Sequence, residues 1–226
     1  MANGRRKSEV FAVANRIFPD SDYDSELKKR LIAVASDLFA THNYSAVSVR
    51  EIANKAGVRQ SAIYYHFEGK EALLNEVLYR FERKYKHFLS AMSERIDNLV
   101  FKEVLPDVVF YNYFVEFTDP ITRLGLSLVL KEHNNNEYAQ ELFYDLIIDQ
   151  SVKQLFSAYS RFFGKGQCNA PKTKALATLS VFHALIINEM QIKDYTGVCK
   201  PQEYTEISDS MSRIFNATLK TPPACT

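Results

Sequence analysis

Apolar residues recur at spacings of three and four along most of the chain, and this period is typical of amphipathic helices. The first such run covers residues 25–44, "SELKKRLIAVASDLFATHNY", with Ser25 as its expected N-cap. Its apolar stripe consists of Leu27, Leu31, Val34, Ala35, Leu38 and Phe39. No strand-like alternation competes with the helical period in the second half of the chain. The pattern therefore predicts an all-α protein.

Two short helices are predicted next, within residues 48–58 and 58–67. Ser48 and Glu51 form the S-x-x-E pattern, in which each side chain accepts a hydrogen bond from the other residue's backbone N–H at a helix start. Gly57 follows at a point where a tight turn needs a residue that tolerates a positive φ. Two short helices joined by a glycine-containing turn are the signature of a helix-turn-helix.

The rest of the chain reads as a series of longer helices. The segment that starts at "KEALLNEVL" continues as one helix over residues 70–96. Further helical stretches are predicted over residues 101–117, 120–132, 136–163, 172–195 and 202–219. The pattern thus adds a larger helical region to the helix-turn-helix.

Composition narrows the class of protein. The chain has 226 residues, of which 46% are hydrophobic, and no apolar window of 18 or more residues, so we expect a cytoplasmic globular protein. Cys168, Cys199 and Cys225 lie far apart and predict neither a disulfide framework nor a metal site. No G-x-S-x-G, H-E-x-x-H or phosphate-binding glycine loop occurs, so we expect neither catalysis nor a cofactor.

Charge is distributed unevenly although the formal net charge is only +1. Residues 1–90 hold 15 Lys and Arg against 11 Asp and Glu, and the remainder holds 13 against 16. The first part is therefore +4 and the rest −3. A basic module beside a mildly acidic one indicates nucleic-acid contact, although charge alone is a weak signal.

The second short helix carries the candidate chemistry. If Ala62 and Ile63 face the preceding helix, an outward face is left that holds Arg59, Gln60, Ser61, Tyr64 and His66, with Tyr65 nearer its edge. Such a face suits the major groove, where glutamine pairs with adenine, arginine pairs with guanine, and phenol or imidazole contacts phosphate. The alternative is that Tyr64 and Tyr65 pack on the body of the protein and His66 is merely solvated.

Lys70 is placed unusually for a lysine. It lies in the first turn of the long helix, where a cation opposes the positive end of the helix dipole. A DNA phosphate docked on the free backbone N–H groups would explain this position. The alternative is a solvated lysine with a small local cost.

Residues 31–78, "LIAVASDLFATHNYSAVSVREIANKAGVRQSAIYYHFEGKEALLNEVL", resemble the DNA-binding domain of TetR-type transcriptional regulators. The resemblance rests on the alanine-rich helix that ends in "LF", the "S-V-x-x-I-A-x-x-A-G-V" helix and the "YYHF-x-x-K-x-x-L" ending. It implies DNA contacts by Ser48, Arg50, Gln60, Ser61, Tyr64, Tyr65, His66 and Lys70. Arg59 stands where Ser or Thr would cap the helix better, so we interpret it as a base or phosphate contact.

The resemblance also implies a domain organisation. We expect an extension over residues 1–23, a DNA-binding domain over 24–70, and a helical effector-binding and dimerisation domain over 71–226. Dimerisation would use the helices at 172–195 and 202–219, the first of which is apolar on two faces. The cluster Arg5, Arg6 and Lys7 is read either as a DNA-tracking arm or as a leader with incidental charge.

Aromatic residues in the larger domain suggest a site for a flat or lipophilic ligand. The candidate lining residues are Phe110, Phe114, Tyr144, Tyr159 and His183. Each ring is also compatible with ordinary core packing, and the histidine with an internal hydrogen bond. The resulting hypothesis is a homodimeric repressor that an effector releases from a palindromic operator. The alternative is a DNA-binding architectural or cell-cycle factor of the same fold, controlled by a protein partner or by no small ligand.

Overall fold

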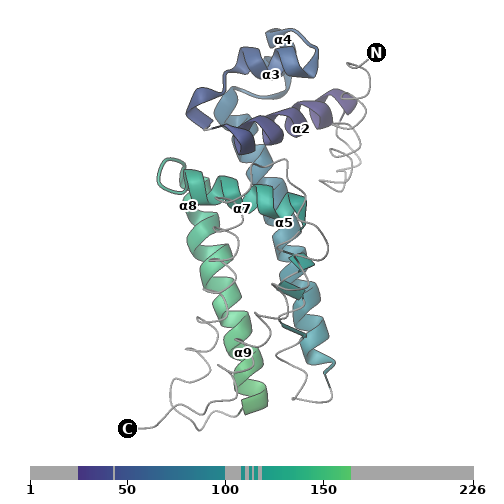
Figure 1. The fold of residues 1–226 in the computed structure, drawn as a ribbon, viewed down its shortest axis with the longest axis vertical. Helices are drawn as coiled ribbons and strands as arrows, with labels where there is room; N and C mark the ends of the chain where they lie inside the picture. The colour runs from purple at the N-terminus through teal and green to yellow at the C-terminus, as the bar shows by residue number, and fades with distance from the viewer. Residues whose placement is uncertain are drawn as a thin grey trace, which may run out of the picture. The chain divides into compact units, whose positions relative to one another are not determined.

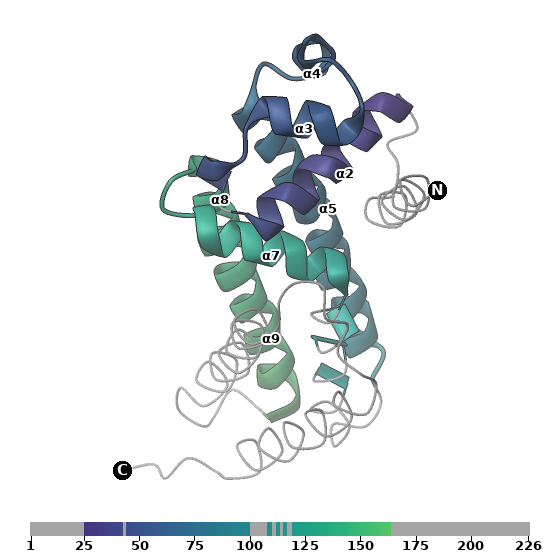
Figure 2. The same ribbon diagram turned by 45° about the horizontal axis from the view of Figure 1, so that its top comes forward.

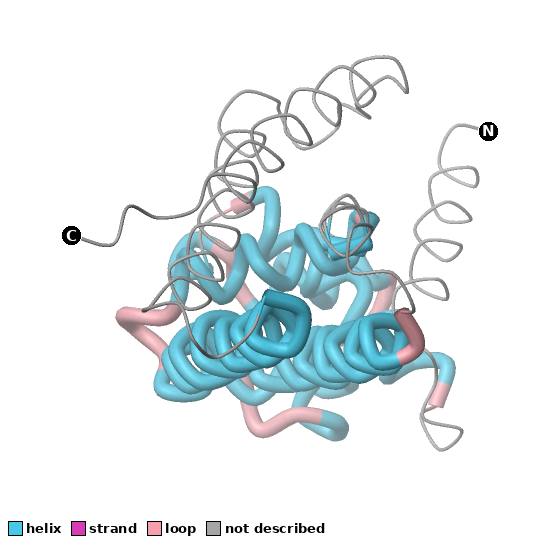
Figure 3. The backbone as a smooth tube through the Cα atoms, turned by 90° about the horizontal axis from the view of Figure 1, so that it is seen from below, coloured by secondary structure: helices cyan, strands magenta, loops and turns pink. Residues whose placement is uncertain are grey.

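A computed structural model describes residues 25–42, 44–99, 108–109, 112–113, 115–116 and 119–163. The predictions for residues 1–23, 172–195 and 202–219 and for the three cysteines fall outside these residues. Helices and connecting loops make up the whole described part, without a strand, which confirms the all-α prediction (Figure 3). The chain divides into two compact units, and one of them joins the residues up to Tyr85 with Pro120–Phe143.

The first unit begins with the predicted helix-turn-helix (Figure 1). Helix α2, Glu26–Thr41, is capped by Ser25, whose side chain accepts from the Lys28 N–H. Helix α3, Val49–Ala56, is capped by Ser48, and helix α4 covers Gln60–His66. Gly57 ends α3 in the left-handed region at φ 70°, which confirms why glycine stands there.

Helix α7, Pro120–Glu132, completes this unit by packing against α2 and against α8, Glu137–Glu141 (Figure 2). The core that they enclose with the first part of α5, Lys70–Asp97, includes Leu31, Phe39, Ile52, Ile63, Leu74, Phe81 and Leu128. Gly125 of α7 lies directly on Phe81 of α5: a Cβ added there would lie 2.7 Å from Phe81 Cβ and closer still to its ring. Only glycine permits this approach of α7 to α5.

The predicted helix over residues 136–163 is interrupted by a π-helix, η3, Leu142–Gln150, between α8 and α9, Ser151–Phe163. The buried positions explain the difference. An uninterrupted α-helix that buries Leu142 and Leu146 would next turn Asp149 and Lys153 inward. The wider π-turn leaves those two exposed and buries Ser151 and Leu155 instead.

The second unit contains Lys86–Asp119 and the chain from Tyr144 on. Here the C-terminal part of α5 runs beside α9, and the six described residues between 108 and 116 are helical (Figures 1 and 2). Phe88 and Tyr113 meet edge to face, with ring centroids 5.1 Å apart, and Met92, Ile96 and Tyr159 of this unit are also buried. In the part of the chain that the structure describes, no helix is both long enough and apolar enough to span a membrane.

Candidate nucleic-acid interface

The start of α3 presents free backbone N–H groups and one cation to solvent. Ser48 Oγ accepts from the Glu51 N–H at 3.1 Å, which confirms this half of the predicted capping pair. Arg50, the second residue of the helix, is exposed in its first turn. Lys55 Nζ holds Asp37 Oδ2 of α2 at 2.6 Å and so helps fix the orientation of α3. This helix start has the geometry that favours an anion.

Helix α4 turns few side chains toward the protein. Ile63 is fully buried and Phe67, which ends the helix, is 6% exposed, so these two anchor it. Gln60 and Ser61 are exposed, as are Tyr64 at 56% and Tyr65 at 85%. Tyr65 is thus more exposed than Tyr64, whereas the sequence predicted that Tyr65 lies nearer the edge of the outward face. The alternative in which these tyrosines pack on the body of the protein does not describe this structure.

The two ends of α4 differ in what their side chains do. Arg59 occupies the N-cap position, makes no capping hydrogen bond and is exposed, which leaves its guanidinium available for another partner. His66 at the other end is half-buried, with its ring edge to face with Tyr65 at 5.0 Å between centroids. An exposed glutamine, arginine and two phenols on one short helix can supply both base-edge and phosphate contacts.

Lys70 is engaged inside the protein. Its Nζ donates to the carbonyl oxygens of Tyr44 and Val47, at 2.8 and 2.9 Å, and lies 4.1 Å from the centroid of the Tyr44 ring. Burial, followed by the charges of Glu71 and Glu132, raises the pKa of the Tyr44 phenol. Tyr44 was not among the predicted site residues, because in the sequence it is only the last residue of the first helical run.

Among the described residues, no cluster of His, Cys, Asp and Glu could hold a metal ion. Three of the predicted ligand-binding residues, Phe110, Phe114 and His183, lie outside the described residues. The other two are not brought together at a cavity described here: Tyr144 is 52% exposed, whereas Tyr159 is fully buried.

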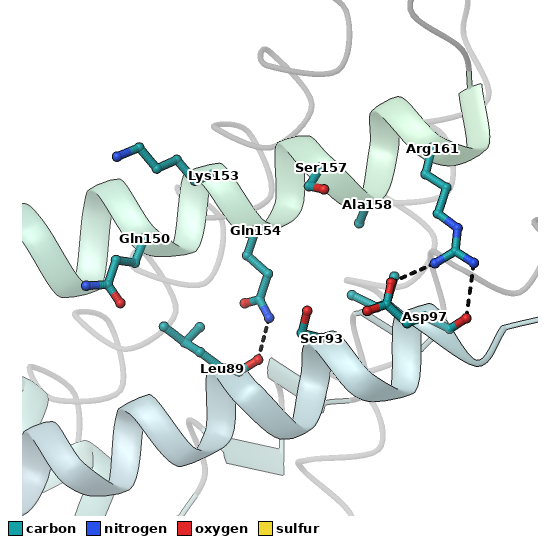
Figure 4. Close-up of a pocket in the computed structure, with 10 residues that line it drawn as sticks. Leu89, Ser93, Asp97, Gln150, Lys153, Gln154, Ser157, Ala158 and Arg161 are labelled. Carbon is teal, nitrogen blue, oxygen red and sulfur yellow. Dashed lines mark hydrogen bonds and ion pairs between the residues drawn. The ribbon is translucent and has the colours of Figure 1, made fainter.

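The second unit does contain an open cavity of about 390 Å³ between α5 and α9 (Figure 4). Leu89, Ile96 and Ala158 give it an apolar floor, and the other seven lining residues are polar or charged. Gln154 Nε2 donates to the Leu89 carbonyl, while Gln154 Oε1 is buried without a hydrogen-bond partner. At one end Arg161 binds Asp97, with Nη1 to Oδ1 at 2.6 Å (Figure 4). A second open cavity, of about 660 Å³, is lined by Arg95 and Asn112 among others.

Comparison with known families finds a match over residues 31–77 to the model of "Bacterial regulatory proteins, tetR family". The curated proteins that are similar to the chain include three HTH-type regulators. The probable HTH-type regulator YttP of Bacillus subtilis is 26% identical, over 58% of this chain and 56% of its own. The HTH-type repressor KstR2 of Rhodococcus jostii is 36% identical, over 26% and 29%. The HTH-type regulator YdgC of Bacillus subtilis is 30% identical, over 53% and 68%.

The matched segments therefore cover about half or less of the first relatives' own lengths. Solved structures share the fold more completely. A TetR-family regulator from Mesorhizobium loti superposes with a TM-score of 0.61 at 18% identity, covering 87% of this chain and 98% of that one. The regulator FadR from Bacillus subtilis, solved in complex with stearoyl-CoA, gives 0.56 at 18% identity, over 82% and 96%.

Proposed function

The chain belongs to the tetR family of bacterial regulatory proteins, and on this premise we propose that it is a DNA-binding transcriptional regulator that acts in the cytoplasm. More specifically, it is a homodimeric repressor of a palindromic operator. A small-molecule effector releases it from DNA. The similar protein from Rhodococcus jostii is named a repressor, which supports this choice over activation.

The observation that carries the proposal is the exposed face of α4. Large apolar or aromatic side chains seldom stay in solvent without a use when they cluster. Here Tyr64 and Tyr65 are both well exposed, beside exposed Gln60 and Ser61, on a helix that needs only Ile63 and Phe67 for anchoring. We assign α4 to the major groove, with Arg59 and His66 at its two ends and Ser48 and Arg50 of α3 on the phosphates.

The homodimer follows from the way such helices read DNA. One α4 spans only a few base pairs, and a pair related by two-fold symmetry reads two half-sites one helical turn, roughly 34–36 Å, apart. We propose that the pairing surface lies in the chain beyond α9, as the sequence predicts for residues 172–195 and 202–219.

The effector site belongs to the second unit in this proposal. Small-molecule pockets have volumes of roughly 300–1,000 Å³, and the cavity between α5 and α9 is of this size at about 390 Å³. Its apolar floor suits a lipophilic molecule, and the unpartnered Gln154 Oε1 suits a hydrogen-bond donor on it. Release requires that the effector bind the DNA-free conformer more tightly than the DNA-bound one.

The test is selection of bound duplexes from a random pool at fixed salt, with wild type, Tyr64→Ala and Tyr79→Ala. Tyr79 is 48% exposed but lies on α5, so its truncation is the matched control. We expect enrichment of an inverted repeat, about tenfold or more weaker binding of it by Tyr64→Ala, and wild-type binding by Tyr79→Ala, because one base-contacting group contributes about 1–3 kcal/mol. A pool without any enriched sequence would contradict the proposal.

The effector is tested separately with the same enriched duplex. A panel of lipophilic molecules, including stearoyl-CoA, is screened for a rise in melting temperature and for weaker DNA binding. We expect at least one compound to do both, and Gln154→Leu to reduce the effect. If no compound does either, the architectural factor controlled by a protein partner, or by no small ligand, becomes the better description.

A further inference from the structure

From the sequence, we attributed the position of Lys70 to a bound DNA phosphate. In the structure, its hydrogen bonds are made within the protein. The ammonium has three N–H donors. Two of them are used on Tyr44 O and Val47 O, at 2.8 and 2.9 Å, and the charge lies above the Tyr44 ring at 4.1 Å from its centroid. The lysine side chain is half-buried in this arrangement. Its charge is therefore already compensated by two carbonyl dipoles and one aromatic face.

The two carbonyls belong to the segment that leads into α3. Tyr44 opens the short 3-10 turn η1, Tyr44–Ala46, and its oxygen also accepts from the Val47 N–H at 3.2 Å. Val47 is 2% exposed and directly precedes Ser48, the N-cap of α3. The carbonyl of a buried residue such as Val47 needs a hydrogen-bond partner, and Lys70 donates to it and to the Tyr44 carbonyl across 23 and 26 residues of sequence.

Two contacts thus meet at the start of α3. On one side, Ser48 Oγ caps the helix through the Glu51 N–H. On the other, Lys70 joins the residue before the cap to the first turn of α5. Because Ser48 and Arg50 follow within three residues of Val47, any shift of that carbonyl moves the groups that face the phosphates.

We propose that Lys70 is a positioning residue for DNA binding, which fixes the entry of α3 through the Tyr44 and Val47 carbonyls and does not itself neutralise a phosphate. The proposal rests on the proposed DNA-binding function. In this role Lys70 holds Ser48 and Arg50 in place. The start of α5 and the start of α3 then move together, because Lys70 links them through the Tyr44 and Val47 carbonyls.

Salt dependence separates a positioning lysine from a phosphate ligand. Each neutralised phosphate adds about 0.9 to the magnitude of the slope of log K against log salt. We would measure this slope with the enriched duplex for wild type and Lys70→Met, which keeps the apolar stem and removes the ammonium. Arg50→Met, at an exposed cation of α3, is the matched control.

For Lys70→Met we expect affinity to fall by about tenfold, the scale of hydrogen bonds to a charged group, with the wild-type slope unchanged. For Arg50→Met we expect the slope to shrink by about 0.9. A slope that shrinks by the same amount in Lys70→Met would identify Lys70 as a phosphate ligand and overturn the proposal. Unchanged affinity in Lys70→Met would overturn it too.

Lys70→Gln provides a second variant, because its amide keeps a hydrogen-bond donor but carries no charge. A positioning role predicts a smaller loss of affinity than in Lys70→Met, whereas a phosphate role predicts the same reduced slope in both. If Lys70→Met folds poorly, the slope of Lys70→Gln against wild type alone decides between the two roles, because only a phosphate ligand predicts a reduced slope.

Amide exchange in the DNA-free protein tests the positioning itself. We expect the Glu51 amide, which is bonded to Ser48 Oγ, to exchange faster in Lys70→Met, with recovery in Lys70→Arg and no change in the middle of α2. Unchanged exchange at Glu51 would refute the positioning role. If wild type binds no duplex but this exchange pattern holds, the proposed function fails while the link between Lys70 and α3 stands.

Discussion

Helices α4 and α7 belong to the same compact unit, but they use their residues in opposite ways. Helix α4 anchors itself with Ile63 and the following Phe67 and leaves most of its seven residues to solvent. Helix α7 buries nearly every described position, and at Gly125 it approaches α5 so closely that no side chain fits. Under the proposed function, the unit separates stability, which the close approach of α7 to α5 supports, from DNA recognition, which we assign to α4. Substitutions in the two helices should have different consequences.

The largest effect is expected from Gly125→Ala. A Cβ at this position would lie 2.7 Å from Phe81 Cβ, and Phe81 is fully buried, so α7 or the ring must shift. Overpacking of this kind costs about 1–3 kcal/mol and sometimes more. It outweighs the roughly 1 kcal/mol that alanine gains over glycine in a helix. Urea denaturation should show a lower free energy of unfolding.

Gly69→Ala is the control for this substitution, because no atom lies within 4 Å of the Cβ it would add. We expect its effect to stay within about 0.5 kcal/mol. Phe81→Ala removes the Cγ and Cδ2 atoms that lie nearest to the added Cβ, so the double variant Gly125→Ala/Phe81→Ala should lose less stability than the sum of the two single variants. Wild-type stability in Gly125→Ala would show that the α7 crossing tolerates a side chain and would remove the contrast with α4.

Two equivalent helix caps, Ser25 and Ser48, test whether DNA recognition and stability are separate, and we expect smaller losses of stability here than at Gly125. Ser25 and Ser48 each accept a backbone N–H at the start of a helix, at 3.2 and 3.1 Å. Replacing either by alanine should cost about 1 kcal/mol of stability. Only Ser48→Ala should also weaken binding to the enriched duplex, because only α3 lies beside α4 at the proposed interface. Equal DNA affinity in the two variants would exclude the start of α3 from that interface.

Features of this unit that depend on neighbouring residues could be predicted from the sequence. The caps Ser25 and Ser48, the left-handed Gly57 and the bounds of α7 all follow from local backbone chemistry. The outward face of α4 also followed, because burying Ile63 fixes the direction of the other side chains over a single short helix.

Features that depend on contacts distant in sequence could not be predicted. Lys70 meets carbonyls that lie more than twenty residues earlier, so no local pattern places its ammonium. Glycine is unfavourable inside a helix, and only the contact of Gly125 with Phe81, which lies far earlier in the sequence, explains its presence in α7. The π-turn in η3 follows from which residues the tertiary structure buries, and α-helical periodicity does not contain that information.

We expect the smallest effect on the free energy of unfolding from Tyr138 of α8, and only at alkaline pH. Tyr138 of α8 donates to Glu82 of α5, and its pKa is raised above the ordinary 10.0 by burial first and then by the bond to Glu82 and nearby charges. Between these two pKa values the unfolded chain loses the phenol proton while the folded chain keeps it. The stability that Tyr138 contributes is therefore fully present below about pH 10 and is lost as pH rises above it.

Tyr138→Phe removes this titration. Because Tyr138 is only half-buried, solvent screens its interactions. The free energy of unfolding therefore changes less with pH than it would for a fully buried phenol. The stability difference between wild type and Tyr138→Phe should favour wild type at pH 8 and shrink by pH 11, as measured by urea denaturation. A constant difference for Tyr138→Phe would mean that burial and the bond to Glu82 do not hold the proton on this phenol, and that α8 adds no such stability to the scaffold.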